Sequence, residues 1–491
     1  MGDLVLSGGG LTTVGTDEML EHARVLSALA TNAEGWGRRL SAQTLALEAP
    51  ASGSAFWSLR RDDAATRAHA AVSLLRQAGA SAGTLSRAVT QSAENYGRAE
   101  RTAKHLAGEA DGLLGWLIGM SLASPATILI ITATALTGAV GFGVSAWFTG
   151  SANASFAQLG KRVRSSGLLS DPRFVSLVGR AISASDNVML GSAHVPLPIV
   201  RALDDDKTGW FGLRGAGRTL IALAGPTLLK ETAVSVHRWN GKNASRAAAA
   251  PAGFEDLAER IPKSAEGKPQ VRLESYAVPG EDRPRWVVYV GGTVDTGFVA
   301  AGEPWDDTAN VQGVAQLDPG SVRATLDAMR DAGAKPGDKV FAVGYSQGGI
   351  VATDVVRQGG FTNGGLVTFG SPTGQMDVPA EVPNVAVEVK EDLIPHLGGE
   401  PRDAAHGGLD RVLVRRSIYD DSPPPADELL PAHALSNYRE TAAMMDGASD
   451  PRLAGMRDHL AAFTGGATPD VSSWRADRVA PGVSGEPGVA R

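Results

Sequence analysis

Hydrophobic residues in the first part of the chain recur with the period of a helix. Between residues 16 and 110, Ala, Leu, Glu and Arg dominate, and apolar positions such as Leu74 and Ala78 lie on one helical face. This spacing predicts a helical N-terminal region. Glycine disfavours helix interiors, so we expect a break where Gly35 and Gly37 occur close together.

The pattern changes after residue 255, where short Val-rich runs alternate with helical ones. Alternating strands and helices predict a mostly parallel sheet flanked by helices, which is an α/β fold. The runs are Arg285–Gly291, Val322–Asp331, Lys339–Gly344, Gly348–Gln358, Leu366–Gly370, Val385–Lys390 and Leu435–Met445.

Residues 112–160 carry no charged side chain. Within this run, residues 126–148 are apolar or small, and about 20 such residues can span a bilayer as a helix. Two interpretations remain open: membrane contact through 113–148, or a hairpin buried in a helical domain.

These patterns divide the 491-residue chain into five parts. We predict an all-α N-terminal region (1–110), an uncharged hydrophobic segment (111–160), a helical connector (161–250), an α/β domain (255–466) and a disordered tail (467–491). The tail is rich in Pro, Gly, Ser and charged residues, which is typical of disorder.

Composition excludes several functional classes. The chain contains no cysteine, so disulfides, thiol catalysis and Cys-ligated metals are excluded. Its net charge of −7 does not indicate a basic surface for binding nucleic acid. No metal or organic cofactor is expected, and the N-terminus lacks the basic and apolar regions of a secretory signal peptide.

The clearest chemical signal is Gly344-Tyr345-Ser346-Gln347-Gly348, which fits G-x-S-x-G. An apolar run precedes it and a helical pattern follows, as a nucleophile elbow requires. The turn is so sharp that side chains at the two glycines would collide with neighbouring backbone. Ser346 is therefore the predicted nucleophile.

A serine hydroxyl needs a base to take its proton, and the base needs an orienting acid. Residues 384–390 form a predicted strand that ends in Glu391-Asp392, and Asp392 is the preferred acid with Glu391 as the alternative. His433 is the preferred base because it follows a Pro-rich loop and precedes a helix. His406 is the second choice, His396 lies too close to Asp392, and His459 falls in a helical run.

The tetrahedral intermediate of acyl transfer needs two or more N–H donors for its oxyanion. One should come from Gln347, the residue after the nucleophile. The other should come from the loop after an earlier strand, where Gly291-Gly292-Thr293 follows residues 285–290. Thr293 is therefore the predicted second donor, with its hydroxyl able to assist.

Five segments in this order resemble the class 3 (fungal-type) lipase family. They are VVYVGGT, GYSQGG, LVTFGSPTG, VEVKEDLIPHL and HALSNY, and they cover about 285–445. The resemblance implies an α/β-hydrolase with Ser346, Asp392 and His433 as triad and Thr293 and Gln347 as oxyanion hole. The chain departs from the family pattern in having Gly-Gly before Thr293 and no His before Ser346, which puts the acyl-chain preference in doubt.

The N-terminal region resembles small WXG-type helical hairpins. Trp36-Gly37 lies within a helical pattern, and Tyr96 and Glu100 are similar to the Tyr-x-x-x-Asp/Glu signal of type VII secretion. This resemblance implies export, a secreted or membrane-associated location, and a secretion-machinery or helical partner for residues 16–110.

The sequence thus favours a serine hydrolase that cleaves carboxylic esters of lipid or acyl substrates through an acyl-enzyme on Ser346. Two alternatives remain. One is an exported or membrane-interacting protein with an inactive hydrolase fold. The other is a hydrolase of peptide or thioester bonds, because the elbow alone does not select the substrate.

Overall fold

The computed structural model describes most of the C-terminal half and selected parts of the N-terminal half. The described residues are 4–8, 14–48, 62–87, 89–90, 168–183, 214, 217–218, 221–222, 228–241, 249–399, 411–419, 423–425, 428 and 430–479. The chain forms two compact units, Leu11–Leu106 and the remainder. The uncharged segment 111–160, Tyr96, Glu100 and His406 lie outside the described residues.

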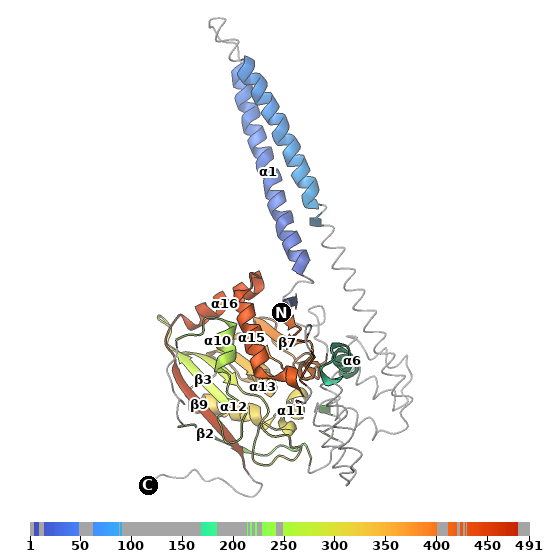
Figure 1. The fold of residues 1–491 in the computed structure, drawn as a ribbon. Coiled ribbons are helices and arrows are strands. Elements are labelled where there is room, and N and C mark those ends of the chain that lie inside the picture. Colours follow the sequence, from blue (N-terminus) through green and yellow to red (C-terminus); the bar gives the residue numbers. More distant parts are fainter. Residues whose placement is uncertain are drawn as a thin grey trace. The chain divides into compact units, whose positions relative to one another are not determined.

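The smaller unit contains two helices that run side by side (Figure 1). Helix α1 spans Val14–Glu48, and residues 62–87 form the second helix. Small side chains let the two backbones approach: Ala23 and Ala33 are buried, and Ser86 Oγ donates to the Ala23 carbonyl at 2.7 Å. The helical pattern of the sequence therefore agrees with the structure over these residues.

The expected helix break at Gly35 and Gly37 is wrong, since α1 continues through both. A glycine inside a helix costs only about 0.5–1 kcal/mol relative to alanine, and packing along a neighbouring helix offsets that cost. Trp36, which lies between them, is 53% exposed.

The larger unit is built on a nine-stranded mixed sheet in the order β1-β8-β7-β6-β5-β4-β3-β9-β2. Strands β4 to β8 are parallel, and the strands flanking them on either side are antiparallel. The strands are β1 (Leu4–Gly8), β2 (Val234–Arg238), β3 (Val271–Tyr276), β4 (Arg285–Val290), β5 (Lys339–Tyr345), β6 (Thr362–Phe369), β7 (Asn384–Val389), β8 (Arg411–Arg416) and β9 (Asp470–Arg478).

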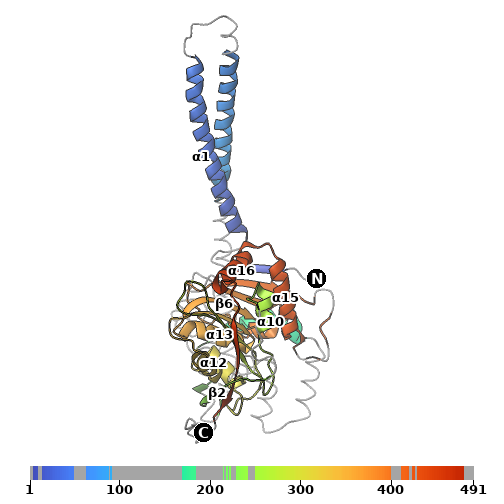
Figure 2. The same ribbon diagram turned by 90° about the vertical axis from the view of Figure 1, so that its left-hand side faces the viewer.

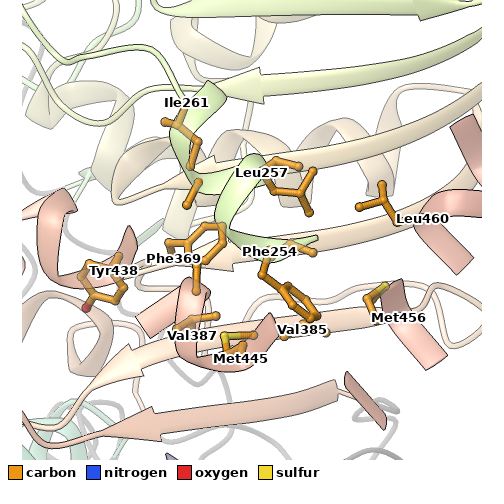
Figure 3. Close-up of a cluster of buried hydrophobic side chains, with 14 of the residues drawn as sticks. Phe254, Leu257, Ile261, Phe369, Val385, Val387, Tyr438, Met445, Met456 and Leu460 are labelled. Carbon is orange, nitrogen blue, oxygen red and sulfur yellow. The ribbon is translucent and has the colours of Figure 1, made fainter. Parts of the chain in front are cut away.

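Helices cover the sheet on both faces, as Figure 2 shows. On one face, α10 (Phe254–Arg260), α15 (Leu435–Gly447) and α16 (Pro451–Thr464) pack against buried strand residues such as Phe369 and Val387 (Figure 3). On the other, α12 (Gly320–Asp331) and α13 (Gln347–Gln358) bury Met329 and Val351 in a second cluster. The prediction of an α/β architecture with a mostly parallel centre is therefore confirmed.

Shorter helices lie beyond the carboxyl ends of the parallel strands. They are α11 (Asp307–Val314) after β4, α14 (Leu393–His396) after β7, and the 3-10 helix η4 (Pro431–His433) before α15. The 3-10 helix η2 (Leu168–Ser170) and helix α6 (Pro172–Ser183) supply Leu169 and Val175 to a small cluster with Leu393 and Leu397 of the α14 region. Their apolar side chains thus pack beside the end of β7.

Three strands lie where the sequence was not predicted to form them. Residues 467–491 were expected to be disordered, but 470–478 form β9 between β3 and β2. The connector 161–250 contains β2, and the all-α region 1–110 contains β1. Strands β1 and β2 have only five residues each, and β9 has nine residues that are mostly polar, so no run of apolar residues marks them in the sequence.

Among the described residues, no helix is both long enough and apolar enough to cross a membrane. The segment proposed for membrane contact, 113–148, is not among them.

A buried arginine fixes the end of β9 to the loop before α11. The Arg478 side chain is 0% exposed and pairs with Asp306, from both Nε and Nη2 at 2.9 Å, and with Glu231 at 2.6 Å. Asp306 is itself buried and caps α11 by accepting from the Ala309 amide. Arg478 therefore joins two carboxylates from distant parts of the chain, and Arg323 supplies Glu231 with a second positive charge.

We predict that Arg478→Met destabilises the larger unit by about 3–5 kcal/mol, because it leaves buried Asp306 without its counter-charge and leaves Glu231 paired with Arg323 alone. Urea denaturation followed by tryptophan fluorescence measures the loss. Arg330→Met is the control, since Arg330 is 71% exposed and pairs with Asp327 on the surface; it should cost less than about 1 kcal/mol. Equal effects of the two substitutions would contradict the importance of the buried pair.

Candidate active site

Ser346 lies in the sharp turn between β5 and α13. Its backbone has φ 55° and ψ −125°, a conformation that side-chain-bearing residues rarely adopt and that costs about 1–3 kcal/mol. The two flanking glycines make the turn sterically feasible. A Cβ atom on Gly344 would lie 2.1 Å from the Gly348 carbonyl oxygen, and one on Gly348 would lie 2.2 Å from the Val290 carbonyl oxygen.

The turn places Ser346 at the N-terminus of α13 and against the base predicted from sequence. His433 Nε2 lies 2.9 Å from Ser346 Oγ, and His433 Nδ1 lies 2.6 Å from Asp392 Oδ2. The three side chains come from the end of β5, the end of β7 and η4. The structure therefore brings Ser346, His433 and Asp392 together in one hydrogen-bonded row, over sequence separations of 87 and 41 residues.

The Asp392 carboxylate is held by two further groups. Its Oδ1 accepts from the Ile394 amide at 2.9 Å, which caps α14, and its Oδ2 accepts from the Tyr438 hydroxyl at 2.5 Å. Burial and the neighbouring Asp392 carboxylate raise the pKa of Tyr438 well above its ordinary value. The phenol therefore stays protonated and donates a hydrogen bond to that carboxylate. Asp392 is 1% exposed and is thus oriented by the backbone and by α15.

Tyr345 holds the imidazole from the opposite side. Its ring stacks on the His433 ring with centroids 5.1 Å apart, and its hydroxyl donates to the His433 backbone carbonyl. Because Tyr345 precedes Ser346 directly, the same turn supplies both Ser346 and the ring that stacks on His433. His433 keeps 17% of its side chain exposed, whereas Ser346 is 7% exposed.

The alternative acid and bases from sequence lie elsewhere. Glu391 accepts from the Ser417 hydroxyl and from the Ile418 amide, so it points toward the chain after β8. His396 Nδ1 lies 3.0 Å from the Asp392 carbonyl oxygen rather than from its carboxylate. His459 is on α16, as its helical pattern predicted, and contacts the Gly364 carbonyl.

The two predicted oxyanion donors flank Ser346. The loop after β4 passes against the nucleophile, since a Cβ atom on Gly292 would lie 3.0 Å from Ser346 Cβ. Thr293 follows directly, and in the described part of the chain its backbone amide has no acceptor. Gln347 begins α13, where the first amides of a helix have no partner within the helix. Within the described ranges, neither N–H group therefore has an acceptor, and both can donate to an anion bound near Ser346.

Helix α11 adds polar groups that the sequence did not single out. Asn310 Nδ2 lies 3.1 Å from both Thr293 Oγ1 and Asp307 Oδ1. The Gln347 side chain donates to the Asp306 carbonyl at 3.0 Å. Burial raises the pKa of Asp307 to about 7. None of the predicted helices covers residues 307–314, and no motif connected this segment to the site.

No group of three or more His, Asp or Glu side chains within the described ranges is arranged to hold a metal ion. The chemistry that these residues can perform is proton transfer between Ser346 and His433, with an anion site formed by two amides. Comparisons with protein-family models, with curated proteins and with solved structures give no match to this chain.

We predict that Tyr438→Phe lowers the free energy of unfolding by about 1–3 kcal/mol, because the buried Asp392 loses a charge-assisted donor. Thermal unfolding of the purified protein measures the change. Tyr419→Phe is the matched control, since Tyr419 is only partly buried and its hydroxyl has no hydrogen bond within the described chain. A Tyr438→Phe protein as stable as the control would show that the short contact to Asp392 contributes little.

We also predict that Asp307 makes stability fall with rising pH. Its pKa is raised from 3.8 to about 7 in the folded protein, so the folded state holds a proton that the unfolded chain releases between these values. The free energy of unfolding should therefore decrease from about pH 4 to about pH 7 and then level off. Asp307→Asn should flatten this slope in denaturation series, whereas Asp331→Asn, at an exposed position on α12, should leave it unchanged. If the free energy of unfolding of Asp307→Asn kept the same dependence on pH, the assignment of this dependence to Asp307 would be contradicted.

Proposed function

We propose that this protein is a serine hydrolase of the α/β-hydrolase class that cleaves carboxylic esters of lipid or acyl substrates. The observation that carries the proposal is the row Ser346 Oγ, His433 Nε2, His433 Nδ1 and Asp392 Oδ2, with contacts of 2.9 and 2.6 Å. Such a row activates a serine hydroxyl, because the base accepts its proton and the acid orients the base. The resemblance of five segments to class 3 lipases supports the same reaction.

The proposed reaction has two halves. His433 accepts the Ser346 proton while Oγ attacks the ester carbonyl carbon, and the resulting oxyanion binds the amides of Thr293 and Gln347. The C–O bond to the leaving alcohol then breaks as His433 returns the proton to that oxygen. In the second half, water transfers a proton to His433 and attacks the acyl-enzyme, which releases the acid and restores Ser346.

Apolar side chains beside the elbow support an acyl substrate. Ile350, one turn after Ser346 on α13, packs in a cluster with Val311 and Val314 of α11 and with Met376. Phe298, in the loop after Thr293, packs against the same cluster. The cluster itself is buried, so Phe298 at its partly buried edge is the apolar surface that an acyl chain would contact.

Two further parts of the proposal concern the N-terminal half. We propose that residues 16–110 form a WXG-type targeting hairpin that binds a secretion-machinery or helical partner, and that 113–148 contacts a membrane. The hairpin of α1 with residues 62–87 supports the first part. Export to the cell surface or medium would follow from it.

The test is labelling of the purified full-length chain with a fluorophosphonate probe, which reacts with activated serines. Wild type should label, and Ser346→Ala and His433→Ala should not. With a 4-nitrophenyl ester, each substitution should lower kcat by about 10⁴–10⁶-fold. Ser264→Ala and His237→Ala are the matched controls, since Ser264 is an exposed serine beside Gly292 and His237 is 59% exposed.

The outcomes separate the alternatives. Labelling that requires both Ser346 and His433, with ester turnover, supports the esterase. Labelling without ester turnover, but with turnover of a thioester or peptide, would replace the proposed substrate class. A folded wild-type protein that neither labels nor turns over any of these substrates would favour the inactive fold.

A further inference from the structure

Tyr345 lies at a position where this chain departs from the lipase family that it resembles, since that family has a histidine before the nucleophile. It is the last residue of β5 and directly precedes Ser346, so the strand that fixes the nucleophile also fixes its side chain. The contacts of this side chain lead to the base and to the groups around it.

The Tyr345 ring lies against three parts of the site. It stacks on the His433 imidazole, with ring centroids 5.1 Å apart and an angle of 21° between the planes. Its centroid is 5.9 Å from that of the Tyr438 ring, and a Cβ atom on Gly292 would lie 3.3 Å from its Cδ1 atom. The ring therefore packs between the base, the tyrosine that donates to Asp392 and the loop after β4.

The Tyr345 hydroxyl holds the main chain of the same histidine, because it donates to the His433 backbone carbonyl. Burial and the nearby Asp392 carboxylate raise the pKa of this phenol well above its ordinary value. The hydroxyl therefore stays protonated at neutral pH and remains a donor. One side chain thus contacts both the imidazole face and the backbone of His433.

The His433 ring becomes positively charged only during the reaction. It is neutral when it accepts the Ser346 proton, and it is an imidazolium once Oγ has attacked the substrate. A cation over the face of a tyrosine ring, within about 6 Å of its centroid, is attracted by the negative face of the π-system. The stacked imidazolium, at 5.1 Å, meets that condition. An attraction that acts on the charged form lowers the barrier and not the ground state.

Asp392 offers the imidazolium only part of its charge. Its Oδ2 lies 2.6 Å from His433 Nδ1 and also accepts from the Tyr438 hydroxyl at 2.5 Å, while its Oδ1 accepts from the Ile394 amide. Each donor stabilises the carboxylate and makes it a weaker acceptor for the imidazolium. The ring of Tyr345 acts on the face of the imidazole, where no hydrogen bond competes with it.

We propose that Tyr345 is a positioning residue whose ring stabilises the imidazolium form of His433 and whose hydroxyl holds that histidine in line with Ser346. This inference rests on the proposed function. Tyr345 acts through His433 and not through the substrate, so its loss should lower kcat and leave KM nearly unchanged.

The test compares Tyr345→Phe, which keeps the ring, with Tyr345→Leu, which removes it, in the full-length chain. The rate of fluorophosphonate labelling is measured against pH, because labelling needs the base without its proton. Tyr345→Leu should lower the pH of half-maximal labelling by about 0.5 unit, since the charged form of the base loses the attraction of the ring. Tyr345→Phe should leave that pH unchanged.

Turnover of a 4-nitrophenyl ester gives the second readout. We expect kcat to fall about 10-fold in Tyr345→Leu and about threefold in Tyr345→Phe, which loses only the hydrogen bond to the His433 carbonyl. KM should stay within about twofold of wild type in both variants. A wild-type pH of half-maximal labelling in Tyr345→Leu would show that the ring only packs, and it would overturn the inference.

Tyr345→pentafluorophenylalanine separates the charge of the ring face from its shape, in case Tyr345→Leu fails to fold. Fluorination reverses the electrostatic potential of the ring face and changes its volume little. This variant should lower the pH of half-maximal labelling and kcat at least as much as Tyr345→Leu does. Equal pH profiles for the phenylalanine and pentafluorophenylalanine variants would contradict the proposed role of the ring.

Phe361→Leu is the matched control. Phe361 is a partly buried aromatic residue that directly precedes β6 and packs against the core cluster on the other face of the sheet. Its replacement should change neither kcat nor the pH profile. Absence of labelling and turnover in wild type would instead contradict the proposed function, which keeps the two failures distinct.

Discussion

The strained backbone of Ser346 is the constraint on which the site depends. Its φ of 55° turns the chain from β5 into α13 within one residue, and the turn leaves no room for a side chain at Gly344 or Gly348. The conformation persists because β5 is paired on both sides in the middle of the sheet and because α13 is buried against it. The surrounding core thus supplies the energy that the turn costs.

The parallel strands determine which residues lie next to Ser346. Strands β4, β5 and β7 all end at one edge of the sheet, so the residues that follow them converge although they are separated in sequence. Thr293, Ser346 and Asp392 each follow one of these strands. His433 arrives from outside the sheet, and the contacts of Tyr345 and Tyr438 with His433 and Asp392 fix it against the edge.

The sequence predicted those parts of the site that depend on local chemistry. The elbow, the strand before Asp392 and the loop around His433 each carry a local pattern, and the structure brings their residues together. The sequence favoured Asp392 but left Glu391 open, because the choice depends on how the chain turns after β7: the Asp392 carboxylate caps α14, while Glu391 turns toward Ser417. Strands β1, β2, β3, β8 and β9 were missed, because none of the predicted apolar runs covers them.

Strand β9 shows that the candidate site also depends on residues outside its sequence motifs. The resemblance to known hydrolases ends near residue 445, yet Arg478 reaches Asp306 from the end of β9 and fixes the first turn of α11. That turn contacts Thr293 through Asn310 and Gln347 through the Asp306 carbonyl. A buried ion pair rarely stabilises a fold more than apolar packing would, but it specifies one geometry. Here the specified geometry lies beside the nucleophile, so the polar C-terminal strand belongs to the same structural unit as Ser346.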